Sequence, residues 1–356
     1  MNSFKNYLTA LVAFSLLVGL PVGGLAHERA RGTFTTIDYP GAADTVECCS
    51  AILNINPEGQ IVGGYLDTIG TGHGFLLSQG SFTTIDYPGS KYTELLGINP
   101  QGDIVGTYVD AASNVHGFLL TEGNFTRIDF PGSVLTFTNW INPEGDIVGG
   151  YMDTAGVFHG FVVSRGTFTT VDYPGAADTF GLGINSAGDI VGIYLDASAV
   201  KAHGFLLSKG SFSSFDYPGS VTNIFACDGF GGGVSYTDGI NNRGEIVGGY
   251  CGADGQLHGF LMSKGSFTTV DFPGAMYSFA GGINSEGEIV GGYQSADGRY
   301  HGFLLSNGGA GRKNAALVAP SRTSEGPNVA PPENVRNLLL RRWRFGRFGA
   351  RLTQPQ

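Results

Sequence analysis

The chain has 356 residues, of which 42% are hydrophobic, 14% are charged and 59 are glycine. So much glycine without a collagen period indicates many tight turns in a β-rich protein. The formal net charge is −10, although residues 312–356 carry nine Lys/Arg against two Asp/Glu. The rest of the chain is therefore strongly acidic, which argues against nucleic acid as a partner, because nucleic-acid-binding surfaces are basic.

Residues 1–26 have the pattern of a signal peptide. Lys5 supplies a positive start, Leu8 to Leu20 is mostly apolar, and Gly24 and Ala26 are small residues at the two positions that a signal peptidase needs. We expect a secreted protein, in the periplasm, on the cell surface or outside the cell. An uncleaved anchor is the alternative, although the apolar stretch is short for a membrane span.

Two short motifs recur along the chain from residue 32 to residue 309. An H-G-F motif returns at spacings of 43, 43, 44, 55 and 43 residues, beginning at His73, His116, His159, His203, His258 and His301. A D-[YF]-P-G motif accompanies it and begins at Asp38, Asp86, Asp129, Asp172, Asp216 and Asp271. Repetition at a period of 20–50 residues is typical of propellers and solenoids.

Each repeat predicts four short strands. In the second unit, Gly97-Ile98-Asn99 ends the first strand and a turn of the N-P-Q-G type leads into D-I-V-G-T-Y. An Asp-rich loop precedes the third strand, H-G-F-L-L, and a two-residue X-Gly turn precedes the fourth. Four strands in about 43 residues is the size of one propeller blade. A parallel β-solenoid is the alternative, although its coils are usually shorter.

The ends of the array predict how it closes. The last unit stops after Leu305 without a fourth strand, whereas the chain begins with a spare one, Thr33 to Tyr39. Pairing the two would remove both exposed sheet edges. We therefore predict an all-β fold: a six-bladed β-propeller of four-stranded blades over residues 32–309, closed by the N-terminal strand pairing with the last blade.

The pattern G-I-N-x-x-G-x-I-V-G followed by H-G-F-L resembles the HAF-type family of bacterial extracellular repeat proteins. This chain has Gly where the family name implies Ala, and it lacks the Trp often found soon after. The resemblance implies export and an HAF repeat architecture, but no established activity.

Each His faces an Asp in the predicted hairpins. Counting outward from the X-Gly turn gives the pairs His73–Asp86, His116–Asp129, His159–Asp172, His203–Asp216, His258–Asp271 and, by ring closure, His301–Asp38. An imidazole beside a carboxylate is part of a hydrolytic triad. However, no Ser or Cys nucleophile recurs beside the pairs, and six active sites in one ring are implausible. We predict structural clasps and no catalytic residue.

Two further patterns suggest a metal or a cofactor only superficially. The Asp-containing loops usually have one acid each, whereas a calcium loop needs several oxygen ligands at fixed offsets. The glycines of I-V-G-G-Y lie inside a strand and lack the helix and lysine of a nucleotide loop. We therefore predict neither a metal nor a cofactor.

Departures from the repeat indicate where binding occurs. Insertions around residues 46–50 and 226–233 fall in crossovers between blades, on the same face as the Asp-rich loops. Loops on a rigid scaffold commonly carry binding residues. The candidates in or near the crossovers are Glu47, Tyr92, Glu94, Trp140, Asp178, Asp228 and Tyr277. We predict a non-catalytic binding protein for a carbohydrate or a surface protein.

Two other functions fit the sequence. A glycan hydrolase or lyase would use two unrepeated acids from among Glu47, Glu94, Asp178 and Asp228. A structural protein of an envelope or matrix would self-associate without a ligand.

The cysteines predict disulfide bonds, and the C-terminal region predicts a linker followed by a basic tail. Cys227 and Cys251 are candidates for a disulfide, whereas adjacent Cys48 and Cys49 allow either a vicinal bond or two separate bonds. Residues 310–332 are predicted to be a linker. The basic tail, residues 333–356, has arginines among apolar residues and suits contact with an anionic membrane or lipopolysaccharide. A disordered tail is the alternative.

Overall fold

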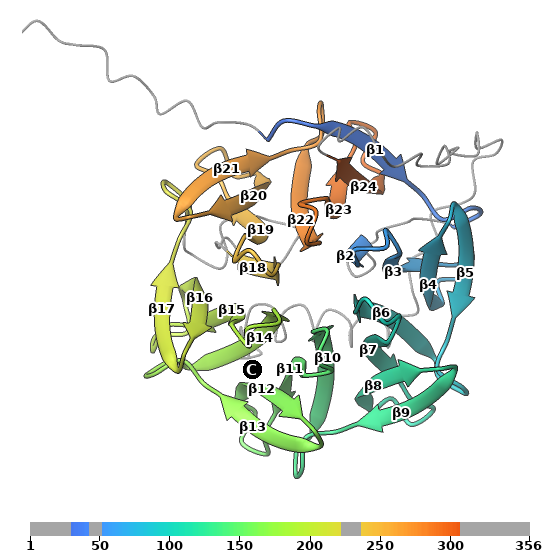
Figure 1. Cartoon of the computed structure of the whole chain (residues 1–356), viewed down its shortest axis with the longest axis vertical. Helices are drawn as coiled ribbons and strands as arrows, with labels where there is room; N and C mark the ends of the chain where they lie inside the picture. The colour runs from blue at the N-terminus through green and yellow to red at the C-terminus, as the bar shows by residue number, and fades with distance from the viewer. Residues whose placement is uncertain (1–29, 43–51, 222–235, 307–356) are drawn as a thin grey trace, which may run out of the picture.

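The computed structural model describes residues 30–42, 52–221 and 236–306. These residues form 24 β-strands. The sheets are arranged around a central axis, as in β-propellers (Figure 1). The all-β, propeller-like prediction is confirmed. No helix in these described ranges is long and apolar enough to cross a membrane.

The strands fall into four sets by their distance from the axis (Figure 1). The innermost strands are β2 (Ile52–Ile55), β6 (Tyr92–Ile98), β10 (Leu135–Ile141), β14 (Asp178–Ile184), β18 (Tyr236–Ile240) and β22 (Tyr277–Ile283). The second strands are β3 (Ile61–Leu66), β7 (Ile104–Val109), β11 (Ile147–Met152), β15 (Ile190–Leu195), β19 (Ile246–Cys251) and β23 (Ile289–Gln294). The third strands are β4 (Gly72–Ser78), β8 (Val115–Thr121), β12 (Phe158–Ser164), β16 (Ala202–Ser208), β20 (Leu257–Ser263) and β24 (Tyr300–Ser306). The outermost strands are β5 (Ser81–Ile85), β9 (Asn124–Ile128), β13 (Thr167–Val171), β17 (Ser211–Phe215), β21 (Ser266–Val270) and β1 (Thr33–Ile37).

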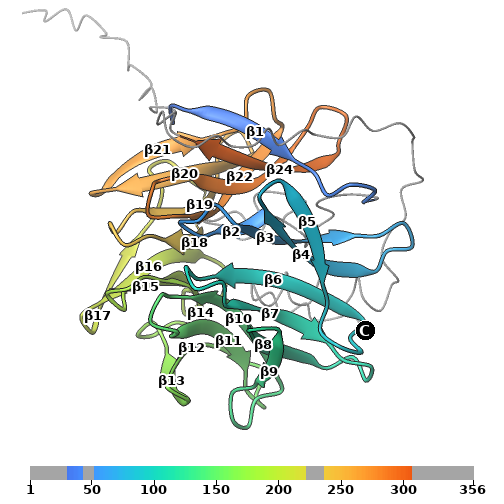
Figure 2. The same ribbon diagram turned by 45° about the vertical axis from the view of Figure 1, so that its right-hand side comes forward.

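Successive strands within each group of four pair antiparallel. Four sheets have four strands, and a fifth has eight because one parallel bridge, Gly72 to Tyr92, joins the groups β2–β5 and β6–β9. The first strand, β1, pairs antiparallel with β24 from Thr33–Ser306 to Ile37–Gly302. The two strands lie side by side in both views (Figure 1, Figure 2). The spare N-terminal strand therefore lies beside the unit that lacks a fourth strand of its own.

The outer hairpins have the expected two-residue turns. In the β4–β5 turn, Gln79 has φ 50° and Gly80 has φ 77°. Two consecutive positive φ values are typical of the type I′ turn, whose twist matches that of the paired strands. The turn fixes the register at Ser78–Ser81 and Gly74–Ile85. This register brings the start of each third strand beside the end of each outermost strand.

Aromatic stacks join successive groups of strands. The Tyr or Phe of each D-[YF]-P-G motif stacks, almost parallel, on the Tyr of the next second strand, with ring centroids 3.6–3.7 Å apart. The pairs are Tyr39–Tyr65, Tyr87–Tyr108, Phe130–Tyr151, Tyr173–Tyr194, Tyr217–Tyr250 and Phe272–Tyr293. Stacked aromatic pairs contribute about 0.5–1.5 kcal/mol beyond the area that they bury. These stacks therefore hold neighbouring blades together.

The glycine of the I-V-G motif allows tight packing inside a blade. A Cβ atom on Gly106 would lie 2.1 Å from the Glu94 carbonyl oxygen and 2.8 Å from Cζ of Phe118. Phe118 is fully buried. Glycine is therefore required for the third-strand Phe to lie flat against the second strand.

Candidate functional site

The alternating direction of the strands separates two faces of the ring. One face, called the crossover face here, has the Asp-rich loops between second and third strands and the connections from each outermost strand to the next innermost strand. The opposite face, called the turn face, has the Asn-containing turns after the innermost strands and the two-residue outer turns. The predicted His–Asp pairs lie at the crossover face.

All six predicted His–Asp pairs are hydrogen-bonded. In each, Nδ1 of the imidazole lies 2.7–3.0 Å from the nearer carboxylate oxygen. The pair His301–Asp38 joins β24 to the end of β1, at 3.0 Å. Each pair ties the third strand to the outermost strand at the open end of the hairpin.

A second partner for the imidazole was missed by the sequence reasoning. Nε2 of four histidines lies 3.2–3.5 Å from an Asp of the preceding loop, in the pairs His73–Asp67, His116–Asp110, His159–Asp153 and His258–Asp254. In the last blade Ser295 takes this place, with Oγ 3.2 Å from Nε2 of His301. The Asp six residues before His73, His116 and His159 was the available signal. With both ring nitrogens engaged, these imidazoles have no nitrogen left to act as a general base.

Hydrogen bonds shift the pKa of two groups in this network. The hydrogen bond from His258 to Asp271 raises the pKa of the imidazole, against the effect of burial. Beside His116, the side-chain amide of Asn114 lowers the pKa of Asp110 to about 2, with help from the Asn114 backbone N–H and His116. Both shifts favour the charged form of the group concerned, the imidazolium of His258 and the carboxylate of Asp110.

Three of the predicted binding residues are buried and therefore do not form an exposed binding surface. Tyr92 is 1% exposed because its ring covers Gly72, where an added Cβ would overlap the ring. Glu94 is 3% exposed, in the middle of β6. Trp140 is 7% exposed and is the sixth of seven residues in β10, so it lies near the turn face rather than at a crossover. Each belongs to an innermost strand, where neighbouring strands cover both faces.

The other predicted binding residues have different positions. Asp178, the first residue of β14, is partly buried and accepts a hydrogen bond from the backbone N–H of Phe158 at 2.9 Å. Tyr277, the first residue of β22, is partly buried against a hydrophobic cluster that includes Phe137 and Phe180 of innermost strands. The predictions that fall outside the described residues are the signal peptide, linker and tail, together with Glu47, Cys48, Cys49, Cys227 and Asp228. Cys251 is buried at the end of β19, and its predicted disulfide with Cys227 stays a prediction.

The described part of the crossover face exposes large apolar side chains instead. The residues are Ile69, Val134, Val200 and Met276, which are 71%, 55%, 40% and 46% exposed. Ile69 and Val200 lie in loops between second and third strands, and Val134 and Met276 immediately precede innermost strands. No other large hydrophobic residue in the described ranges is similarly exposed. All four of these exposed side chains therefore lie on the crossover face, beside its Asp-containing loops.

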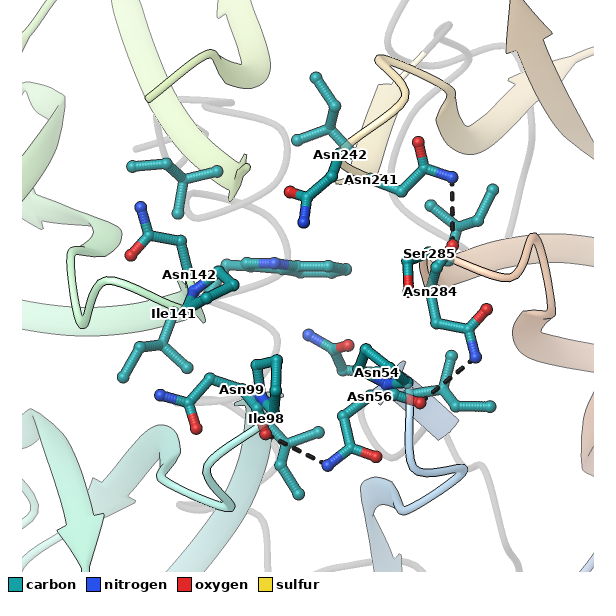
Figure 3. A pocket seen from close by; sticks show the side chains of 18 residues that line it. Asn54, Asn56, Ile98, Asn99, Ile141, Asn142, Asn241, Asn242, Asn284 and Ser285 are labelled. Carbon is teal, nitrogen blue, oxygen red and sulfur yellow. Dashed lines mark hydrogen bonds between the residues drawn. The ribbon is translucent and has the colours of Figure 1, made fainter. Parts of the chain in front are cut away.

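A pocket lies on the axis at the turn face (Figure 3). Its volume is about 60 Å³, and residues from the ends of all six innermost strands line it. The lining contains Asn, Ile, Pro, Trp and Ser, without a charged side chain among the described residues. The pocket was not predicted from the sequence.

Asparagines surround the pocket and link neighbouring blades. Each Asn at the end of an innermost strand accepts the N–H of the residue four positions later, as Asn56 does from Gln60 at 2.9 Å. Five of their Nδ2 groups also donate to the backbone carbonyl of the corresponding Asn in the next blade, over 3.1–3.4 Å, in Asn56→Asn99, Asn142→Asn185, Asn185→Asn241, Asn241→Asn284 and Asn284→Asn56. These asparagines are structural.

Two residues at the pocket depart from the repeat. The position before each Ile-Asn pair is glycine in four units but is Asn54 in the first and Trp140 in the third. Asn54 is 1% exposed, and its Nδ2 has no hydrogen-bond partner. Its side chain points toward the middle of the ring (Figure 3). Within the described ranges, no group of three or more His, Cys, Asp or Glu residues could hold a metal ion.

No protein-family model and no curated protein sequence matches the chain. Among solved structures, the chain is similar to the lectin of Aleuria aurantia, described as a six-bladed β-propeller, at 14% identity over 73% of this chain and 93% of the lectin, with a TM-score of 0.45. It is also similar to AofleA of Arthrobotrys oligospora, at 13% identity over 78% and 88% of the two chains and a TM-score of 0.48. Trypanosoma rangeli sialidase is a third, at 10% identity, 78% and 59% coverage and a TM-score of 0.46. Similarities this low carry no information on what this chain binds.

Proposed function

We propose that this chain is an exported, non-catalytic binding module. It is a six-bladed β-propeller closed by β1, and its crossover face binds another protein of the cell surface or periplasm. Closure is supported by three interactions across the seam: the pairing of β1 with β24, the Tyr39–Tyr65 stack and the hydrogen bond from Asn284 to Asn56.

The observation that carries the proposal is the set of exposed apolar side chains on the crossover face. Residues at the matching loop positions differ between blades: Ile69 corresponds to Ala112 and Ala155, and Val134 corresponds to Lys91. The repeat does not require an apolar residue at these positions. Apolar surface that is buried by a partner is typical of protein interaction sites, and we propose that one partner spans these side chains of different blades.

The proposed partner is a protein rather than a glycan because of the chemistry of these side chains. Ile, Val and Met offer flexible or branched apolar surface, which fits an apolar patch on a protein. A sugar-binding site needs placed polar groups beside apolar or aromatic side chains. On the described crossover face, the Tyr and Phe rings of the D-[YF]-P-G motifs are instead stacked between blades.

The His–Asp pairs support a non-catalytic role. They repeat in all six units, and the second nitrogen of five of the imidazoles also lies near a carboxylate or hydroxyl oxygen. A clasp explains their repetition, whereas a catalytic dyad would be needed only once.

Site-specific photo-cross-linking tests the proposal. A photoreactive residue is placed at Val134 or Met276 on the crossover face and, as matched controls, at the exposed turn-face residues Glu122 or Lys209. After incubation of the full exported chain with the envelope fraction of the producing cells, we expect a discrete protein adduct from the crossover positions only. Equal adducts from both faces, or none, would contradict the proposed surface. Release of products from a panel of envelope polysaccharides would instead indicate an enzyme.

A further inference from the structure

The axial pocket on the turn face has two side chains that the repeat does not explain. At the ring position just before Ile-Asn, four units have glycine: Gly97, Gly183, Gly239 and Gly282. The other two units have Asn54 and Trp140, and both residues line the pocket. These two replacements of glycine, at equivalent positions of the repeat, place a polar and an aromatic side chain in the same small pocket.

Trp140 reaches across the axis. A Cβ atom on Gly239 of β18 would lie 2.7 Å from Cη2 and 3.1 Å from Cζ3 of the indole. The ring of a residue in β10 therefore occupies the space that a side chain on β18 would fill. As one of the lining residues, it gives the pocket an aromatic wall.

Asn54 brings an unused hydrogen-bond donor to the pocket. Its side chain is almost fully buried, yet its Nδ2 has no hydrogen-bond partner. By contrast, Nδ2 of Asn56, two residues later, donates to the Asn99 carbonyl. Burying an unsatisfied donor is unfavourable. A ligand that brings an acceptor oxygen to Asn54 would satisfy this donor.

The lining limits the ligand to a neutral group. No charged side chain among the described residues lines the pocket, so nothing there compensates a charged ligand. The volume of about 60 Å³ accommodates a substituent rather than a whole sugar ring. A fitting ligand brings an acceptor oxygen to Asn54 and a C–H surface to the indole of Trp140 and the Ile side chains of the lining. A sugar carries both kinds of group.

We propose that the axial pocket on the turn face binds one neutral sugar unit, whose hydroxymethyl or N-acetyl group enters to accept a hydrogen bond from Asn54 while its C–H surface contacts Trp140. This site is separate from the proposed protein-binding surface, which lies on the opposite face. Failure of either proposal therefore leaves the other standing.

Intrinsic fluorescence can report on this pocket alone. The chain has two tryptophans, so a Trp343→Phe background leaves Trp140 as the only tryptophan, whose emission is excited selectively over that of tyrosine. This protein is titrated into the millimolar range with N-acetylglucosamine, which has both groups, with galactose, which has the hydroxymethyl group, and with fucose, which has neither. We expect a saturable change in Trp140 emission with N-acetylglucosamine or galactose, and none with fucose. No saturable change with N-acetylglucosamine or galactose in a folded protein would overturn the proposal, and so would an equal response to fucose.

Substitution of Asn54 separates binding from folding. Asn54→Leu keeps the size of the side chain but removes the unsatisfied donor, so we expect it to melt no lower than the parent while its response falls at least tenfold. Asn124→Ser is the matched control, because it changes an exposed Asn of the turn face to the serine found in other units, and it should respond as the parent does. An unchanged sugar response in Asn54→Leu would place the sugar elsewhere. A lower melting temperature of Asn54→Leu would show that Asn54 is structural and would also overturn the proposal.

Discussion

Replacing His258 with Ala tests the structural role of the His–Asp clasps most sharply. Its Nδ1 lies 2.9 Å from Asp271, and its Nε2 lies 3.2 Å from Asp254, whose side chain is 52% exposed. A hydrogen bond to a charged, mostly buried partner contributes about 1.5–3 kcal/mol. The contact with exposed Asp254 contributes less than about 1 kcal/mol, and the stack on Tyr250, with centroids 5.1 Å apart, adds about 0.5 kcal/mol.

We therefore expect His258→Ala to reduce the free energy of unfolding by about 3 kcal/mol, whereas the matched Asp254→Ala change costs less than about 1 kcal/mol. Urea unfolding followed by circular dichroism measures both. A loss below about 1 kcal/mol for His258→Ala would refute the clasp. It would point instead to a functional imidazole, whose removal leaves stability unchanged.

The pH dependence of this difference has a defined sign. The pKa of His258 is higher in the folded chain than its usual value, mainly because of Asp271. The extra stability is therefore fully present below about pH 6.5 and is lost as the pH rises through the raised folded pKa. The difference between the parent and His258→Ala should shrink over this range. A difference that grows with pH would contradict the ion-pair assignment.

The remaining predictions concern the acid limit, the seam and the two ends of the chain. Asp110, with a folded pKa of about 2, stabilises the chain above about pH 4 and loses this effect as the pH falls toward 2. Asn114→Ala should therefore raise the pH of the acid unfolding midpoint. An unchanged midpoint would argue against the contact between Asn114 and Asp110. Tyr39→Ala removes the stack on Tyr65 across the seam and should cost about 2–4 kcal/mol in urea unfolding, whereas a neutral effect would argue against closure at β1. N-terminal sequencing of the exported protein should begin at residue 27; an intact N-terminus would favour the anchor. Deletion of residues 333–356 should reduce binding to anionic vesicles, and unchanged binding would contradict membrane contact through the tail.

The repeat explains why much of the fold could be predicted. The X-Gly turns fix the register of the outer hairpins, so simple counting places His116 opposite Asp129. The missing fourth strand of the last unit likewise identifies β1 as the partner of β24. Both inferences use short-range rules of turn and strand geometry that act the same way in every unit.

The axial pocket was harder to predict because its residues come together only when the whole ring has formed. Asn54 and Trp140 are separated along the chain and approach only around the axis, and no local pattern measures that distance. The burial of Tyr92 and Glu94 was missed for a related reason. Alternation within a strand does not reveal that the innermost strands are covered on both sides.

The central claim is that the crossover face binds a protein, and affinity for the cross-linked partner tests it most directly. Val134→Ser combined with Met276→Ser removes two exposed apolar groups without touching the core. Burial of such side chains contributes about 1–2 kcal/mol each, so we predict at least tenfold weaker binding at an unchanged melting temperature. Native affinity in this double variant would contradict the claim.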